Sequence, residues 1–347
     1  MNMLFHTYTE NCQNTSVSIV KYNKNSFHEY TVKNMYEIEN HVNDSDYVVW
    51  IDIKGKRDKN IINEVGKMLG IHASVTSYLC NPSQLSHFEI YDLYQLLVMK
   101  VFSTIEDNKV HATPVSILVG NNTVITVQNG VQDSFNTVRA SLRSGNSRSE
   151  GVDFLIYTFI EIINSTHYPV ISLLGNKLEE LENNVLLNSS TNNLTGTEIH
   201  QLGRRFMFAY RELWNHKEAL KDFVANSDIV MRTKNSHFLR RCYDHSSEIL
   251  EMVQMYIDMS KNLMNVYLAI VNNKINEVMK VLTVLISVFA PITIISSMYG
   301  MNFNNMPGLH EWWGFPLAVA EMFVSSLVML FLFKRMGFIK KIFKRKK

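Results

Sequence analysis

Two apolar runs near the C-terminus constrain this chain more than any other feature. Residues 281–299 contain only Ser and Thr as polar interruptions, and residues 315–333 contain one charge, Glu321. Each run has the roughly 20 residues that an α-helix needs to cross the hydrocarbon layer of a membrane. Only the short interval 300–314 separates the two runs. The sequence therefore predicts a membrane-spanning helical hairpin whose two ends lie on one side.

The distribution of charge predicts which side that is. The interval 300–314 has no Lys or Arg, whereas the segment from Lys334 to Lys347 has eight Lys or Arg and no acid. The positive-inside rule places this tail in the cytosol, and the N-terminal part with it. We therefore expect a protein of the cell's inner (plasma) membrane with both termini cytosolic. The tail is expected to contact phospholipid headgroups and not nucleic acid.

Several function classes are disfavoured by what the sequence lacks. The three cysteines, Cys12, Cys80 and Cys242, are scattered and share no metal-binding spacing with histidine. This pattern favours a reducing compartment over a disulfide framework. There is no HExxH motif, no Gly-rich phosphate loop and no nucleophile–base arrangement. The N-terminus lacks the apolar core of a signal peptide. We expect no enzyme activity, no catalytic residue and no bound cofactor.

The first 165 residues read as a mixed α/β domain. Residues 47–53 and 94–102 are short apolar runs typical of buried strands. Residues 115–119 and 123–127 flank Gly-Asn-Asn, which predicts a β-hairpin. Residues 60–69 have helical periodicity and end at Gly70. Strands that alternate with helices favour a layered α/β core.

The second part of the chain reads as long helices. There is no proline between Pro169 and Pro291 and no glycine between Gly203 and Gly300. Helices are expected over 173–187 and 198–224, with a polar turn over 226–235. A third helix from His237 to Tyr299 would be about 90 Å long at 1.5 Å per residue. A helix of that length must be a stalk that continues into the membrane.

These observations predict six segments. They are a cytosolic α/β domain (1–165), a cytosolic long-helix bundle and stalk (166–277), a first transmembrane helix (278–299), an outer loop (300–314), a second transmembrane helix (315–334) and a basic cytosolic tail (335–347).

Small or polar residues recur along the first span at steps of mostly three or four. They are Asn276, Thr283, Ser287, Ala290, Thr293 and Ser297. Such a face could line a water-filled path, or its hydroxyls could bond the preceding helical turn and pack helices closely. Two spans per chain cannot enclose a pore, so transport would require a cyclic oligomer. Met279, Leu282 and Ile286 follow the same stripe and could close such a pore by dewetting, or simply pack.

The outer end of the first span carries the sequence Tyr-Gly-Met-Asn-Phe, residues 299–303. With residues 276–283 upstream, Pro291, the Met306-Pro307 loop and the basic flank, it closely resembles the CorA family of magnesium channels of the Gly-Met-Asn type. The resemblance implies a funnel-shaped homopentamer in the membrane whose first spans line the pore. It implies a selectivity filter of Gly300, Met301 and Asn302, in which Asn302 binds the ion through its hydration shell. Asn276 and Thr293 would form further polar rings.

The chain departs from the family pattern at several positions. The outer loop has Gly308 where the family commonly has Glu, and Glu311 is the one acid left in the loop to attract cations. Ala290 replaces a bulkier pore residue. The acidic positions at which bound Mg²⁺ can close family members correspond to Tyr78 and Arg241, which do not suit a hard cation. Arg241 could instead occupy the place of that cation by pairing with an acid across the subunit interface.

Mg²⁺ is the expected transported ion. One alternative keeps the fold and changes the cargo to Co²⁺, Ni²⁺ or Zn²⁺. An alternative of another class is a membrane-anchored cytosolic scaffold or sensor, whose hairpin only tethers it; the polar stripe and Asn302 disfavour this class.

Overall fold

The computed structural model describes residues 15–32, 36–42, 44, 46–55, 57–81, 83–105, 109–129, 133–188, 193–226, 236–301, 308 and 311–337. The chain divides into two compact units, Met1–Met264 and Asn265–Lys347. We call them the N-terminal and the C-terminal unit and describe each by itself.

The N-terminal unit is built on a seven-stranded sheet with the order β2-β1-β3-β7-β6-β5-β4. Strand β3 runs parallel to β7, and the other neighbours are antiparallel. The strands are β1 (Ser16–Tyr22), β2 (Phe27–Thr31), β3 (Val48–Lys54), β4 (His87–Ile90), β5 (Gln95–Ile105), β6 (Lys109–Val119) and β7 (Thr123–Gln128).

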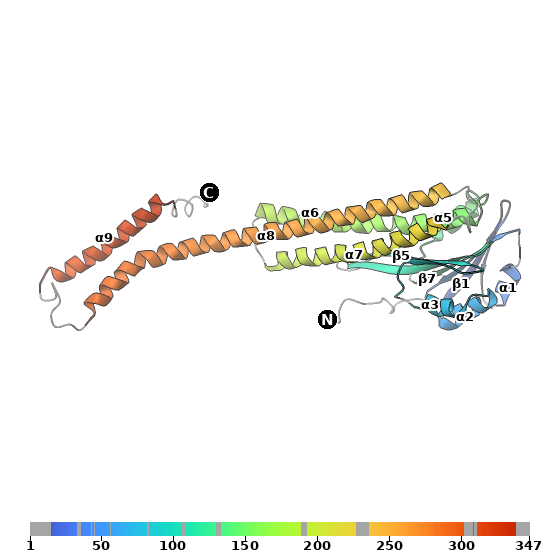
Figure 1. Cartoon of the computed structure of the whole chain (residues 1–347), viewed down its shortest axis with the longest axis horizontal. Helices are drawn as coiled ribbons and strands as arrows, with labels where there is room; N and C mark the ends of the chain where they lie inside the picture. Colours follow the sequence, from blue (N-terminus) through green and yellow to red (C-terminus); the bar gives the residue numbers. More distant parts are fainter. Residues whose placement is uncertain are drawn as a thin grey trace. The chain divides into compact units, whose positions relative to one another are not determined.

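Helices cover both faces of this sheet. One face packs against α1 (Glu37–Val42), α2 (Lys59–Met68) and α3 (Ala73–Leu79). The other packs against α4 (Asn136–Ser144), α5 (Val152–Ser165), α7 (Asn193–Ala225) and the start of α8 (Ser236–Tyr299). Helix α6 (His167–Asn188) runs beside α7 (Figure 1). The result is a three-layer α/β/α arrangement with one apolar core on each side of the sheet.

The main sequence expectations for this unit are confirmed. Strands β3 and β5 and the β6–β7 hairpin lie where the apolar runs and the Gly-Asn-Asn turn predict them. Helix α2 ends before Gly70, which has φ +68°, a left-handed conformation that glycine adopts without strain. Helix α8 is one continuous helix of 64 residues. Most of the turn expected over 226–235 lies outside the described residues.

A buried polar network joins the sheet to the helices that cover it. The ring of His167 donates from Nε2 to the carbonyl of Lys100 (2.9 Å), and His216 donates from Nε2 to the Oδ1 of Asn164 (2.7 Å). The Asn164 amide donates to the carbonyl of Cys242 (3.1 Å). The two imidazoles meet edge to face at 4.7 Å, and each leaves a buried Nδ1 without a hydrogen-bond partner. Protonation of either Nδ1 would place an unpaired charge in the core.

This network predicts that acid destabilises the N-terminal unit. Burial lowers the pKa of His167 from 6.5 to about 4, and burial together with His167 lowers the pKa of His216 well below its usual range. Between pH 6.5 and 4 the unfolded chain therefore binds protons that the folded chain does not, so stability falls as the pH falls. For His167 alone the loss amounts to about 3 kcal/mol by pH 4.

Chemical unfolding of the detergent-solubilised protein, followed by the fluorescence of the buried Trp50, measures this dependence. His167→Gln keeps a donor for the Lys100 carbonyl but does not titrate, so its stability should depend less steeply on pH. The same change at the exposed His200 is the control and should leave the slope unchanged. An unaltered slope in His167→Gln would contradict the assignment.

Candidate ion-conducting site

The C-terminal unit contains the end of α8 and helix α9 (Gly314–Arg335). Both helices are long and apolar enough to cross a membrane, and these are the two such helices among the described residues. The most apolar window of α8 has 0% of its residues buried, and that of α9 has 6%. Core helices of soluble proteins would be mostly buried. These two helices therefore need an apolar environment or partner chains around them.

One side of α8 faces α9. The hydroxyl of Ser326 on α9 donates to the carbonyl of Val288 on α8 at 3.3 Å. The residues of α8 that are partly buried around this contact share its side of the helix. They are Val284, Ser287, Val288, Pro291, Ile292 and Ile295.

The side of α8 away from α9 holds the residues that the sequence predicts to line a pore. At about 100° per residue, their positions cluster opposite the stripe that contains Val288. All of them are exposed: Asn276, Met279 (53%), Leu282 (46%), Thr283, Ile286 (60%), Ala290, Thr293 and Ser297. Ser287 is the exception among the small and polar residues, since it is partly buried with the residues on the α9 side. The pore-lining role of the exposed set stays a prediction.

Two threonine hydroxyls on this face bond within their own helix. Thr283 donates to the carbonyl of Met279 (2.8 Å), and Thr293 donates to the carbonyl of Phe289 (3.0 Å). A hydroxyl that donates to the preceding turn still has oxygen lone pairs to offer. The intrahelical bond and a role in a water-filled path are therefore compatible, because the exposed oxygens can accept hydrogen bonds from water around a cation.

Helix α8 ends in backbone hydrogen bonds at Gly300 and Met301. The N–H of Gly300 donates to the carbonyl of Ser296 (3.0 Å), and that of Met301 donates to the carbonyl of Met298 (3.2 Å). Gly300 does not take a positive φ, so its backbone conformation there is one that other residues can also adopt. Met301 is 53% exposed. Asn302, the central residue of the predicted filter, lies outside the described residues.

Gly308, which lies later in the loop, has a left-handed backbone conformation with φ +82°. Its carbonyl accepts from the N–H of Glu311 (3.3 Å), whose own carbonyl accepts from the N–H of Gly314 (3.1 Å). The indole of Trp313 lies against Gly308, 3.5 Å from where a Cβ would be. A left-handed backbone at this position favours glycine over residues with a side chain. The side chain of Glu311 is exposed, as attraction of cations would require.

Tyr78 and Arg241, which stand at the positions of the family's acidic regulatory residues, lie in the N-terminal unit. The hydroxyl of Tyr78 lies 3.2 Å from Nδ1 of His87, and burial raises the pKa of Tyr78. Arg241 is exposed on α8. Within the described part of the chain, no three His, Cys, Asp or Glu side chains lie close enough together to hold a metal ion.

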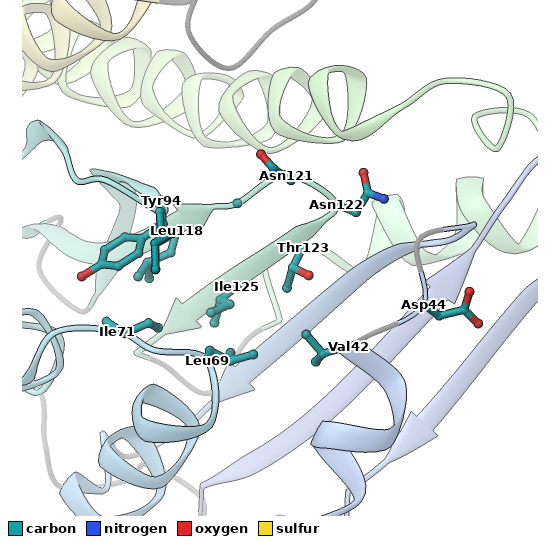
Figure 2. Close-up of a pocket in the computed structure, with 12 residues that line it drawn as sticks. Val42, Asp44, Leu69, Ile71, Tyr94, Leu118, Asn121, Asn122, Thr123 and Ile125 are labelled. Carbon is teal, nitrogen blue, oxygen red and sulfur yellow. The ribbon is translucent and has the colours of Figure 1, made fainter.

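A pocket of 420 Å³ also opens in the N-terminal unit, beside the β6–β7 turn (Figure 2). Its floor is apolar and includes Leu69, Ile71 and Ile125. Asp44 is the one carboxylate among the lining residues, and it accepts a hydrogen bond from Lys21 at 2.7 Å. Among its described lining residues the pocket therefore presents no unpaired negative charge that would attract a divalent cation.

The geometry of the hairpin agrees with a family comparison. Residues 45–335 match the family model described as "CorA-like Mg2+ transporter protein". The chain belongs to this family. Both helices that could span a membrane fall within the matched region, as do Gly300, Met301 and Asn302.

Named CorA proteins are similar to this chain over almost its whole length. The cobalt/magnesium transport protein CorA of Thermotoga maritima is 29% identical over 322 residues, which covers 92% of this chain and 91% of the relative. The cobalt/magnesium transport protein CorA of Methanocaldococcus jannaschii is 24% identical and covers 84% and 92%.

Solved structures share the CorA fold. The complete CorA magnesium transporter of M. jannaschii matches with a TM-score of 0.78 at 21% identity and covers 93% of this chain and 98% of that one. The full-length CmaX protein matches with a TM-score of 0.73 at 12% identity and covers 94% and 99%. The expected fold, an α/β domain whose long helices continue into a two-helix hairpin, is therefore confirmed.

Two features of this CorA-like hairpin were not singled out from the sequence. One is the bond from Ser326 to α8, for which the only signal is a pair of serines in an apolar span. The other is the close approach of Gly314 to Gly308, for which the signal is a glycine immediately before the second span.

Proposed function

We propose that this chain forms a homopentameric channel that lets Mg²⁺ enter the cell down its electrochemical gradient. The observation that carries the proposal is the exposed stripe from Asn276 to Ser297, on the side of α8 that α9 leaves open. In a monomer this stripe would meet lipid, where its Asn and Thr side chains gain nothing. A ring of five α8 helices would turn it toward a shared aqueous path.

In this proposal Asn302 forms an amide ring at the outer mouth. Mg²⁺ is small and loses its water reluctantly, so it is usually bound with several waters in place. Amide oxygens can accept hydrogen bonds from those waters without a fixed charge. Gly300 and Met301 would complete the filter, and Glu311 would raise the local cation concentration through its exposed carboxylate.

The other residues of the stripe would have different roles at successive depths of the ion path. Thr293 and Asn276 would form polar rings nearer the middle and the inner end. Met279, Leu282 and Ile286, all large and exposed, would form an apolar constriction that closes when it dewets. Ala290 leaves the path wider between these groups.

The segment boundaries predicted from the sequence give the placement in the membrane. Residues 278–299 and 315–334 would span the inner membrane, residues 300–314 would form the outer loop, and the 335–347 tail would contact anionic lipid on the cytosolic side. The N-terminal unit would then be cytosolic. Transport of this kind needs no catalytic residue and no bound cofactor.

The names of the relatives and coordination chemistry support the proposed cargo. The two CorA relatives are named for cobalt and magnesium transport, so we propose Mg²⁺ first and Co²⁺ second. Oxygen ligands and a hydrated ion favour Mg²⁺ over the borderline ions Ni²⁺ and Zn²⁺.

Purified protein in liposomes that contain a magnesium-sensitive dye tests the proposal. We expect Mg²⁺ influx that increases with an inside-negative potential, and weaker competition from Ni²⁺ and Zn²⁺ than from Co²⁺. Stronger transport of Zn²⁺ or Ni²⁺ would assign another cargo. An absence of flux for every divalent ion would support a membrane-anchored scaffold.

A further inference from the structure

Pro291 interrupts the hydrogen bonds of α8 within its membrane-spanning part. Proline has no N–H, so the carbonyl of Ser287, four residues earlier, loses its helical donor, and the proline ring pushes that carbonyl aside. Sharp bends of helices are usually found at proline. In Figure 1 the ribbon of α8 bends within its C-terminal part. The α8 backbone is therefore less firmly held around Pro291 than elsewhere in the span, and a contact from a neighbouring helix beside it can influence the bend.

Ser326 of α9 donates next to the interrupted carbonyl, and its one hydroxyl proton is shared between α8 and its own helix. Its hydroxyl lies 3.3 Å from the carbonyl of Val288, the residue next to Ser287, and 2.9 Å from the carbonyl of Met322 in its own helix. The neighbouring Ser325 bonds the Met322 carbonyl as well, at 3.0 Å. The two serines therefore make the same local contact, and the bond to α8 distinguishes Ser326.

We propose that Ser326 is a positioning residue, which fastens the proline-bent segment of α8 to α9 and so sets the direction of the outer part of α8. The role in transport rests on the proposed function, in which α8 lines the ion path. The fastening itself does not depend on what is transported. It is a contact between two helices of one chain, one residue from the carbonyl whose helical donor Pro291 removes.

Because the bend lies within the ion-path stripe, a change in this contact would displace the residues of α8 that follow Pro291. The stripe residues Asn276 to Ala290 precede Pro291, whereas Thr293, Ser297 and Gly300 follow it. The nine residue steps from Pro291 to Gly300 span about 14 Å, so a change of ~10° in the bend would move Gly300 by about 2 Å. In a ring of subunits every copy would move together, and the outer mouth would change in width.

The first experiment compares Mg²⁺ influx of full-length variants in liposomes. Ser326→Ala should lower the initial rate about fivefold, the effect of losing one hydrogen bond of ~1 kcal/mol at 1.4 kcal/mol per tenfold. Ser325→Ala and Ser326→Thr, which keep the hydroxyl bond to α8, should stay within about twofold of wild type. In a Pro291→Ala background, Ser326→Ala should have no further effect. Equal rates for the Ser326→Ala and Ser325→Ala variants would overturn the proposal.

A second readout separates this proposal from the transport function. Spin labels attached at Met298→Cys, beyond the bend, and at Ile275→Cys, before it, report distances between subunits in a variant without native cysteines. Both positions are exposed, at 58% and 53%. Ser326→Ala should shift or broaden the distances at 298 and leave those at 275 unchanged. Unchanged distances at 298 would refute the fastening, even if the flux falls. Shifted distances in a protein without flux would uphold the fastening and refute the channel.

Discussion

Asn302→Ala is expected to lower Mg²⁺ influx by at least about 100-fold. Five amides at one ring would each contribute ~1 kcal/mol of hydrogen bonding to the waters of the ion, so their loss together removes several kcal/mol. Since 1.4 kcal/mol corresponds to a tenfold change, two or more factors of ten follow. The effect should appear in the liposome assay as lost influx of Mg²⁺ and of Co²⁺ alike, because both arrive hydrated.

The outer loop offers matched controls for this variant. Asn304 and Asn305 lie two and three residues further along the same loop and carry the same side chain. Their alanine variants should transport within about threefold of wild type if recognition belongs to residue 302 alone. All three variants should elute as the same oligomer in detergent. A normal influx through Asn302→Ala would remove the filter from the proposal, whatever the other two variants do.

The parts of the fold that could be predicted from the sequence are those with a strong local signal. Strand β3 is a short apolar run interrupted by one acid, Asp52, and α8 has no glycine or proline before Pro291. The edge strand β2 was not predicted, since its side chains are mostly exposed and its sequence lacks alternation. Helix α6 begins at His167, six residues before the helix expected over 173–187, because Pro169 lies in its first turn, where the missing N–H costs nothing.

The candidate site shows a similar division. Periodicity alone placed Asn276, Thr283 and Thr293 on one face of α8, because residues three and four apart share a face of a helix. The role of Asn302 came only from the resemblance, since a single Asn in a loop has no periodic signal. The Ser326–Val288 bond joins residues on two helices, and their pairing depends on how far the connecting loop lets the helices slide.

Gly314 is the second position at which a small change should have a large effect. A Cβ at this residue would lie 2.0 Å from the carbonyl oxygen of Gly308 and 2.9 Å from its carbonyl carbon. These are backbone atoms, so no side-chain rotation can relieve the overlap, and one end of the turn must move. That turn connects the outer loop to the first residue of α9, and its displacement would change where residue 308 lies.

We therefore expect Gly314→Ala to lower Mg²⁺ influx by about tenfold or more, as overpacking costs of 1–3 kcal/mol imply. Gly308→Ala should have a smaller effect, because its left-handed φ of +82° costs an alanine only about 1 kcal/mol and its Cβ would meet Trp313 at an ordinary 3.5 Å. Gly151→Ala, with open space around it, is the control for a glycine replacement in general.

The measurements are influx in liposomes and the unfolding midpoint of the N-terminal unit for each variant. The N-terminal unit should keep its midpoint in Gly314→Ala, since the clash lies wholly within the C-terminal unit. If Gly314→Ala transports Mg²⁺ as fast as Gly151→Ala, the turn can change its conformation without affecting transport. The outer loop would then be free to move relative to the start of α9, and ion recognition could not depend on the close contact of these two glycines.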